Sequence, residues 1–363
     1  MVFSERVTNI TYNEILPSIV DFVNNSNIFT ARVTSSPKNW KGVTIDQPIR
    51  IANSTTGGSF DGLDQFDTSA TNNTRHLSWY VKAYEQSVVV PGIEKAVNGT
   101  SDKQVLSLVA DRLDEAKNSM TDAIGDLLYG YGTGKDIEGL GLIVDNGTAT
   151  SSYGGVSRSD VPAVNADVTP ASSGELTLAL VSSEFDAVSA AGSGQESPTI
   201  ALTTKAIWSL FEQVLQSDGN LAGTYTATSI KGYNRVSGKT PVGTSVPAEA
   251  LKGALGVDAI SYRGKPVVAD DKAPTGTFFW LNENYLEFRR LLSPDLESVS
   301  SKNQVTEGIN KDIEQPSFLQ LREFLKPVNQ FGEIGALIVM GNLIHRNPRR
   351  NGKITGITKL ASA

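Results

Sequence analysis

The chain has 363 residues, of which 39% are hydrophobic and 20% charged, a composition typical of folded chains with a large core. Its 32 Lys and Arg and 39 Asp and Glu give a net charge of −7, which argues against nucleic-acid binding through bulk positive charge. The absence of cysteine excludes disulfides, thiolate metal sites and cysteine nucleophiles. No apolar stretch approaches the roughly 18 residues of a membrane span. The start of the sequence lacks the basic-then-apolar pattern of a signal peptide, so we expect an acidic, soluble, cytosolic chain.

The first part of the sequence predicts an arm followed by a long β-hairpin. Within residues 1–35 we expect one short helix, over 17–23. Alternating apolar residues then predict two antiparallel strands, the second with Leu77 and Trp79 on one face. The polar segment between them is too long for a tight turn, and such loops are usually functional or mobile. Because both faces of the hairpin are half apolar, we expect it to lie on something other than its own chain.

Residues 101–130 have the clearest helix pattern in the chain. Ser101 and Gln104 form a capping box, and charged residues occupy the face opposite an apolar stripe. The stripe consists of Val105, Val109, Leu113, Ala116, Met120, Ile124 and Leu127. At 1.5 Å per residue, this helix would be roughly 45 Å long, with one side packed and one side wet.

The remaining sequence predicts a mixed α and β region. We expect strands at the start of 138–168, over 199–202, 259–262, 266–269, 277–281, 333–346 and 353–357. We expect helices over 174–190, over the residues after Thr204, over 284–292 and over 318–325. Residues 217–257 are rich in Gly, Ser and Thr and predict a surface loop.

No motif in the chain predicts catalysis. Residues 130–135 contain the glycines and the lysine of a phosphate loop, but the first required glycine is missing and the segment follows a helix. A Ser/His/Asp triad would need one of the two histidines, His76 or His345, and neither lies at a strand-to-helix elbow. The pair Asp270 and Asp271 is typical of a turn. We therefore expect no catalytic, cofactor-binding or metal-binding residues and no enzyme activity.

Two charged segments are candidates for contacts between copies of the chain. One is the polar loop at 54–75, whose only basic residue is Arg75, and the other is a turn near the C-terminus. The acidic set is Asp61, Asp64 and Asp67, and the basic set is Arg346, Arg349 and Arg350. Either both sets are simply solvated, or the loop of one copy docks on the turn of a neighbour. Single exposed ion pairs are weak, so the second interpretation needs repetition over many copies or desolvation.

The order of the predicted elements resembles the major capsid proteins of tailed bacteriophages, the Hong Kong 97-type fold. An arm, an extended hairpin, one long helix, a mixed domain and a final apolar strand pair follow one another in both. The most specific similarity lies in the segments GLGLIVDNGT at 139–148 and YGGVSR at 153–158. A second similarity covers KPVNQ at 326–330, GNL at 341–343 and NPRR at 347–350.

The resemblance implies an α+β fold with an N-terminal arm, an extended loop, a peripheral domain with a long spine helix and an axial domain. The implied division is an arm at 1–35, an extended loop at 36–95, a peripheral domain at 96–175 with its spine helix at 101–130, an axial domain at 176–310 and a return to the peripheral domain at 311–363. The implied function is that of a structural subunit. Hexamers and pentamers of it would assemble in the host cytoplasm into an icosahedral shell, the virion capsid, around double-stranded DNA.

The implied partners are other copies of the chain, a portal and either a separate scaffolding protein or none, with only non-specific DNA contact and no membrane. The sequence leaves open whether a decoration protein also binds. Some members of this fold form a covalent crosslink through a lysine of the extended loop. Residues 54–75 contain no lysine, so no such crosslink is expected. Residues 1–35 lack a long charged helical segment, so no large N-terminal cleavage is expected. An encapsulin-type nanocompartment shell is the alternative within the fold, and a carboxylate-based hydrolase is the alternative from another class.

Overall fold

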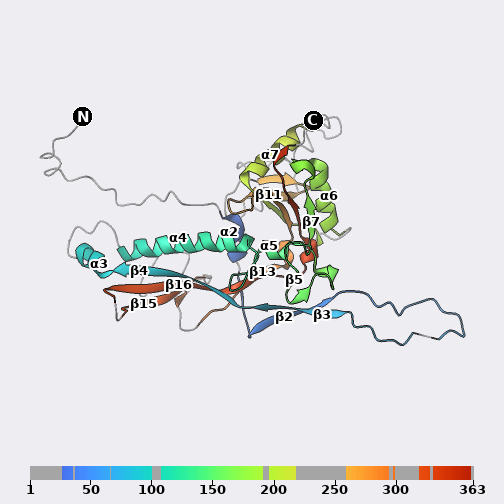
Figure 1. Ribbon diagram of the computed structural model, residues 1–363, viewed down its shortest axis with the longest axis horizontal. Helices are drawn as coiled ribbons and strands as arrows, with labels where there is room; N and C mark the ends of the chain where they lie inside the picture. Colours follow the sequence, from blue (N-terminus) through green and yellow to red (C-terminus); the bar gives the residue numbers. More distant parts are fainter. Residues whose placement is uncertain are drawn as a thin grey trace. The chain divides into compact units, whose positions relative to one another are not determined.

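The computed structural model describes residues 27–35, 37–65, 67–99, 108–190, 196–217, 259–293, 297–298, 319–327 and 330–360 (Figure 1). The helix expected over 17–23, the capping box at 101 and 104, and the loop expected over 217–257 lie outside the described residues. The chain forms two compact units. Unit 1 contains the described parts of 85–121 and 295–338, and unit 2 contains those of 26–84, 122–294 and 339–363.

Unit 1 is built on the strand β16. β16 (Gly332–His345) pairs with β4 (Lys82–Pro91) and, antiparallel, with β15 (Gln320–Leu325), which in turn pairs with β14 (Glu297–Ser298). The helix α3 (Gly92–Gly99) follows β4 directly. The strand expected over 333–346 is thereby confirmed. The helix expected over 318–325 is wrong, because the edge of β16 offers this segment a hydrogen-bonded strand partner, with Gln320 opposite Ile338.

The long helix α4 (Leu108–Tyr129) confirms the central part of the expected helix, and at 1.5 Å per residue it is about 33 Å long. Ala116, Met120, Ile124 and Leu128 are buried at intervals of four residues, and Gly125 and Tyr129 beside them are buried as well. Burial of Ala116, Met120 and Ile124 confirms that part of the expected stripe, whereas Leu113 and Leu127 are only half-buried and Leu128 is buried in place of Leu127. Val105 and the side chain of Val109 lie outside the described part of the chain. The helix begins in unit 1 and ends in unit 2.

The core of unit 2 is a mixed sheet of six described strands in the order β10-β11-β9-β12-β17-β7. These are β7 (Asp167–Pro170), β9 (Ile200–Thr203), β10 (Ala259–Tyr262), β11 (Lys265–Ala269), β12 (Phe278–Leu281) and β17 (Gly352–Thr355). The helices α6 (Leu178–Val188) and α7 (Lys205–Ser217) bury Phe185, Phe211 and their neighbours against Trp280 of β12. Thr177 caps α6 by accepting a hydrogen bond from the Leu180 N–H at 3.0 Å. The strands and helices expected here are confirmed.

A second set of strands in unit 2 includes residues 286–290, for which the sequence predicts a helix. The helix expected over 284–292 is wrong, since β13 (Leu286–Arg290) pairs antiparallel with the end of β16 and parallel with β1 (Lys38–Asn39). Its Leu, Glu and Arg residues favour helices intrinsically, but this preference is worth only a few tenths of a kcal/mol per residue. The hydrogen bonds of the strand pairing, in which Leu286 lies opposite His345 and Arg290 opposite Gly341, outweigh this helix preference.

The segment after α4 also differs from the expectation. The strand expected at the start of 138–168 is wrong, because residues 140–143 form the short helix α5 (Leu140–Ile143). Gly139 and Gly141 let this helix approach the last carbonyl groups of α4 closely. A Cβ atom at Gly139 would lie 2.4 Å from the Leu127 carbonyl oxygen, a distance that no side chain tolerates.

The helix α2 (Ile28–Thr34), which the sequence did not indicate, packs within unit 2. The Phe29 N–H donates to Asp270 Oδ2 at 2.7 Å, and the Phe29 side chain is buried. Arg32 forms a bidentate ion pair with Glu283, with both distances 2.8 Å.

The hairpin consists of β2 (Thr44–Arg50) and β3 (Thr74–Tyr80), with Ile45 opposite Trp79. Leu77 and Trp79 are fully buried within unit 2, and the rings of Trp79 and Tyr153 lie 6.1 Å apart, edge to face. The expectation that the hairpin lies only on another molecule is therefore wrong for its base, which packs on its own chain.

The remaining described elements are β5 (Ser152–Tyr153), β6 (Val156–Ser157), β8 (Glu175–Leu176), β18 (Lys359–Leu360) and 3-10 turns at Pro162–Val164, Ser172–Gly174, Glu283–Tyr285 and Pro348–Arg350.

Candidate subunit-contact surfaces

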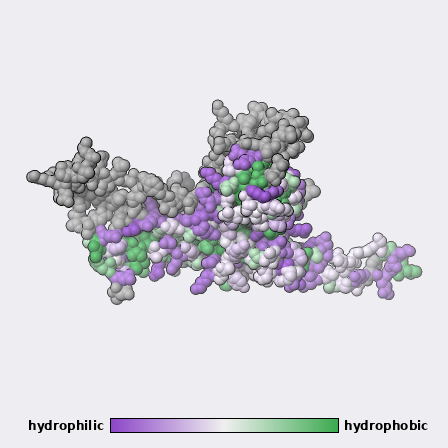
Figure 2. Space-filling view, turned by 45° about the horizontal axis from the view of Figure 1, so that its top comes forward, coloured by the Kyte–Doolittle hydropathy of each residue, from purple (hydrophilic) through white to green (hydrophobic). Residues whose placement is uncertain are grey.

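The tip of the hairpin presents apolar side chains to solvent. Residues 51–73 connect β2 to β3 and extend beyond the ends of both strands (Figure 1). Phe60 is 65% exposed and Leu63 is 100% exposed. Figure 2 shows hydrophobic atoms in green at the far end of this loop, surrounded by polar ones. The loop thus carries exposed apolar side chains at its tip.

All three members of the acidic set lie on this loop and are exposed. Asp64 Oδ2 accepts a hydrogen bond from the Asp61 N–H at 2.8 Å, and the Asp64 N–H donates to the Asp61 carbonyl at 2.9 Å. Asp67 accepts from the Ser69 N–H at 2.9 Å, and hydrogen bonding with Ser69 lowers the pKa of Asp67. The carboxylates therefore shape the loop locally and remain accessible.

In the basic set, Arg346 belongs to a network around one buried carboxylate. Glu287 lies on β13 with its side chain 5% exposed, 2.7 Å from both Arg346 Nη2 and Lys38 Nζ and 2.9 Å from Arg289 Nη2. Burial by itself favours the neutral acid, but the hydrogen bond from Lys38 and the charge of Arg346 outweigh it and lower the pKa of Glu287. Arg346 is therefore held in place within its own chain.

The other two arginines of the basic set differ from each other. Arg350 Nε lies 2.6 Å from Glu196 Oε2, and Tyr285 donates its hydroxyl hydrogen bond to the same carboxylate. The hydrogen bond from Tyr285 is the main reason that the pKa of Glu196 is lowered. Arg349 is exposed. Contact of the basic set with a neighbouring copy stays a prediction, and Arg349 is its most accessible member.

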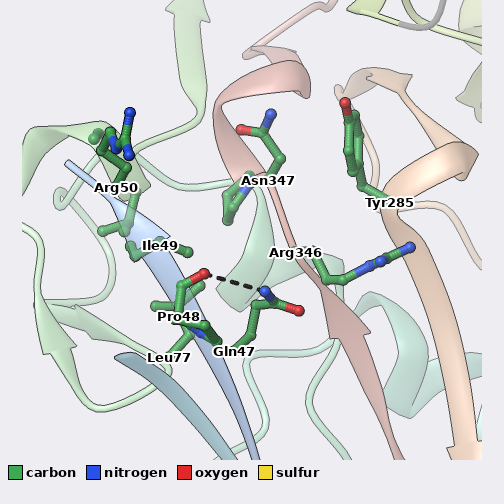
Figure 3. A pocket seen from close by; sticks show the side chains of 11 residues that line it. Gln47, Pro48, Ile49, Arg50, Leu77, Tyr285, Arg346 and Asn347 are labelled. Atoms are coloured by element: carbon green, nitrogen blue, oxygen red, sulfur yellow. Dashed lines mark hydrogen bonds between the residues drawn. The ribbon is translucent and has the colours of Figure 1, made fainter. Parts of the chain in front are cut away.

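An open pocket of about 340 Å³ lies in unit 2 between the hairpin base and the turn that carries the basic set. In Figure 3 the strand with Pro48 and Ile49 lies on one side, and the segment with Arg346 and Asn347 lies on the other. Leu77, Val164 and Pro348 add apolar surface, and Arg50 adds a second guanidinium. The sequence did not predict this pocket, because its walls are far apart along the chain.

Two of the segments that carry the resemblance, 139–148 and 153–158, contact one another. Arg158, at the end of YGGVSR, is buried and donates to the Asp145 and Val164 carbonyls at 2.7 and 2.9 Å and to the Leu142 carbonyl. Burial lowers the pKa of Arg158. Asn342 of GNL accepts from the Glu138 N–H at 3.0 Å and donates to the Tyr80 carbonyl at 3.1 Å. These polar residues organise backbone that would otherwise be buried without partners, so their role is structural.

The histidines occupy opposite environments. His76 is exposed on β3, whereas His345 is buried, accepts from the Asn347 N–H at 3.2 Å and lies 3.2 Å from the Asn282 carbonyl oxygen. Burial lowers the pKa of His345 to about 3, so the ring is neutral and supports the backbone.

Among the described residues, no three His, Asp or Glu side chains gather where they could hold a metal ion. None of the helices in the described ranges is long and apolar enough to cross a membrane.

No protein-family model and no curated protein matches this sequence. The fold, in contrast, is similar to solved shell structures along the whole chain. The capsid asymmetric unit of cyanophage A-1(L) matches with a TM-score of 0.68 and 16% identity, over 98% of this chain and 100% of that chain. The SrpI encapsulin of Synechococcus elongatus PCC 7942 matches with a TM-score of 0.57 and 11% identity, over 100% and 99%. The capsid of the native GTA particle matches with a TM-score of 0.56 and 8% identity, over 97% and 96%.

These similarities define the class of architecture. The chain has the fold of phage capsid and encapsulin shell subunits, and the Hong Kong 97-type α+β fold expected from the sequence is confirmed.

Proposed function

We propose that the chain is the major capsid protein of a tailed phage, a structural subunit whose hexamers and pentamers form an icosahedral shell around double-stranded DNA. The observation that carries this proposal is the similarity of the fold, over nearly the full length of both chains, to the cyanophage capsid subunit. A shell subunit needs no catalytic group, so we assign the chain a structural and not an enzymatic role.

The exposed loop supports a function based on self-association. A subunit that places an apolar tip on a different surface of the next copy makes a heterologous contact, and such contacts generate closed rings when the rotation closes. Many modest contacts then hold the assembly together through multivalency. The net charge of −7 suits a container wall that must not bind its DNA tightly.

The further assignments follow the resemblance. The part of the extended loop (36–95) beyond its buried base would lie across a neighbouring subunit, 96–175 and 311–363 would form the peripheral domain, and 176–310 would form the axial domain around the fivefold and local sixfold axes. The acidic set of one copy would meet the basic set of another. The shell would assemble in the host cytoplasm with a portal and a separate scaffolding protein, and it would offer its surface to a decoration protein in the virion.

Negative-stain microscopy of the purified full chain tests the proposal. We expect closed particles of uniform size, whereas a monomer at high protein concentration would contradict it. Deletion of 54–75 provides a matched variant, because these residues lie outside the buried base of the hairpin. The deleted chain should remain soluble and assemble poorly.

An encapsulin-type compartment is the second candidate, because the SrpI encapsulin also matches over the full chain. The two functions differ in what the particle contains. Co-purification of one enzyme inside the particles would favour the compartment. Incorporation of a portal protein at one vertex would favour the capsid.

A further inference from the structure

The pocket beside β2 has the chemistry of a receptor for an acidic, apolar segment. Of the eleven lining residues that the structure describes, two are arginines, Arg50 and Arg346, and none is acidic. Arg346 is held at the wall by its ion pair with Glu287, and its buried Nε atom has no hydrogen-bond partner within the described part of the chain. Arg50 is exposed at the end of β2. A volume of about 340 Å³ is at the small end of ligand pockets, which suits one or two side chains better than a cofactor.

The loop tip has the matching chemistry. Phe60, Asp61, Leu63 and Asp64 alternate apolar and acidic side chains, and the sequence contains no lysine or arginine between Arg50 and Arg75. The hydrogen bonds between Asp61 and Asp64 close a turn, so the tip is already ordered before it meets a partner. Preorganisation of this kind reduces the entropy lost on binding.

We infer that the pocket receives the loop tip of a second copy of the chain, with Leu63 on its apolar wall. The carboxylates beside Leu63 then face the two arginines of the pocket. This inference rests on the proposed shell function and specifies where the loop of one subunit binds the next. The occupant is another copy and not the same chain, because Phe60 and Leu63 are exposed in the chain that carries them. A contact between two different surfaces repeats from copy to copy, as ring closure requires.

Disulfide trapping tests the contact directly, because the natural sequence contains no cysteine. The full chain would carry Leu63→Cys at the tip and Ala163→Cys in the pocket, and it would be oxidised with copper–phenanthroline after assembly. Each single variant can form at most a covalent dimer, because one thiol makes one disulfide. The double variant should form a ladder of trimers and larger species on a non-reducing gel.

A geometric control uses Ile93, which is 70% exposed on α3 in unit 1. Leu63→Cys combined with Ile93→Cys should give no more than dimers. A ladder from this pair, or dimers alone from the pocket pair, would overturn the inference. If unmodified shells form without the pocket ladder, the docking site is wrong and the shell function stands. If the unmodified chain forms no shells, the proposed function itself fails.

A second measurement does not depend on disulfide geometry. Leu63→Ser should raise the protein concentration required for assembly about tenfold, since it removes a side chain that the contact buries. Val43→Ser is the matched control, because Val43 is 85% exposed but lies outside the tip. Equal shifts for both variants would count against a specific pocket.

Discussion

The base and the tip of the hairpin carry similar apolar side chains in opposite environments. At the base, Leu77 and Trp79 are completely buried against residues from 153–154 of the same chain, whereas at the tip Leu63 is fully exposed. Burial of the base fixes the direction in which the hairpin leaves unit 2. The exposure of the tip leaves apolar surface for a partner. One hairpin therefore combines an intramolecular anchor with a tip for which we propose an intermolecular contact, and the following changes test that division.

The largest effect is expected at the base. Trp79→Ala should lower the free energy of unfolding of the unassembled subunit by about 3–5 kcal/mol, the usual cost of removing a fully buried Trp. Urea denaturation measures this cost. Tyr80→Ala, at the neighbouring exposed position, should change it by less than about 0.5 kcal/mol. Similar losses for the two variants would mean that the base is not anchored as described.

The next largest effect concerns the charge network that positions Arg346 beside the pocket. Glu287→Gln should destabilise the subunit by about 1–3 kcal/mol at pH 7, because three cations lose their shared carboxylate. The folded state lowers the pKa of Glu287, so its contribution is present above the unfolded pKa, about 4.3, and disappears as pH falls through the folded pKa. The difference between wild type and variant in urea denaturation should shrink below about pH 4. A difference that grows on acidification would show that the carboxylate is not stabilised by these cations.

A smaller effect is expected from the acidic set. Exchange of Asp61, Asp64 and Asp67 for Lys should weaken assembly several-fold at low salt, since each exposed pair is worth about 0.2–1 kcal/mol. At 1 M salt the Debye length falls to about 3 Å, so the difference should largely vanish. Light scattering during assembly at two salt concentrations measures this. Identical assembly curves for wild type and variant at both salt concentrations would show that these carboxylates make no electrostatic contribution to the contact. Arg349→Glu tests the other partner in the same assay.

The smallest effect on the folding of the isolated subunit is expected at the tip. Leu63→Ser should leave the free energy of unfolding within about 0.5 kcal/mol of wild type, because the side chain is fully exposed. The same urea titration as for Trp79→Ala gives a direct comparison of tip and base. A loss of several kcal/mol would show that the tip packs on its own chain.

Several parts of the candidate surfaces could be predicted from the sequence. The acidic residues of the loop and the arginines near the C-terminus are visible as local clusters, and the loop was expected to be long and polar. The sequence could not show that Arg346 binds Glu287 or that Arg350 binds Glu196, because these partners are 59 and 154 positions away. It placed Leu77 on the apolar face of a strand, but it could not show that Tyr153 and Gly154 of the same chain cover this face.

By itself, the sequence determined the elements whose pattern is long and regular: the helix around α4, the hairpin strands, β16, and the α6 and α7 helices. A periodic apolar face specifies such elements locally, because it can be buried in only one way. Only the tertiary structure decided the short segments. Residues 286–290 and 320–325 became strands because β16 offered them a partner, and residues 140–143 became a helix because two glycines allow close packing on α4. In short segments the local preference is weaker than the energy of a hydrogen-bonded edge or a close backbone contact, so distant residues determine the outcome.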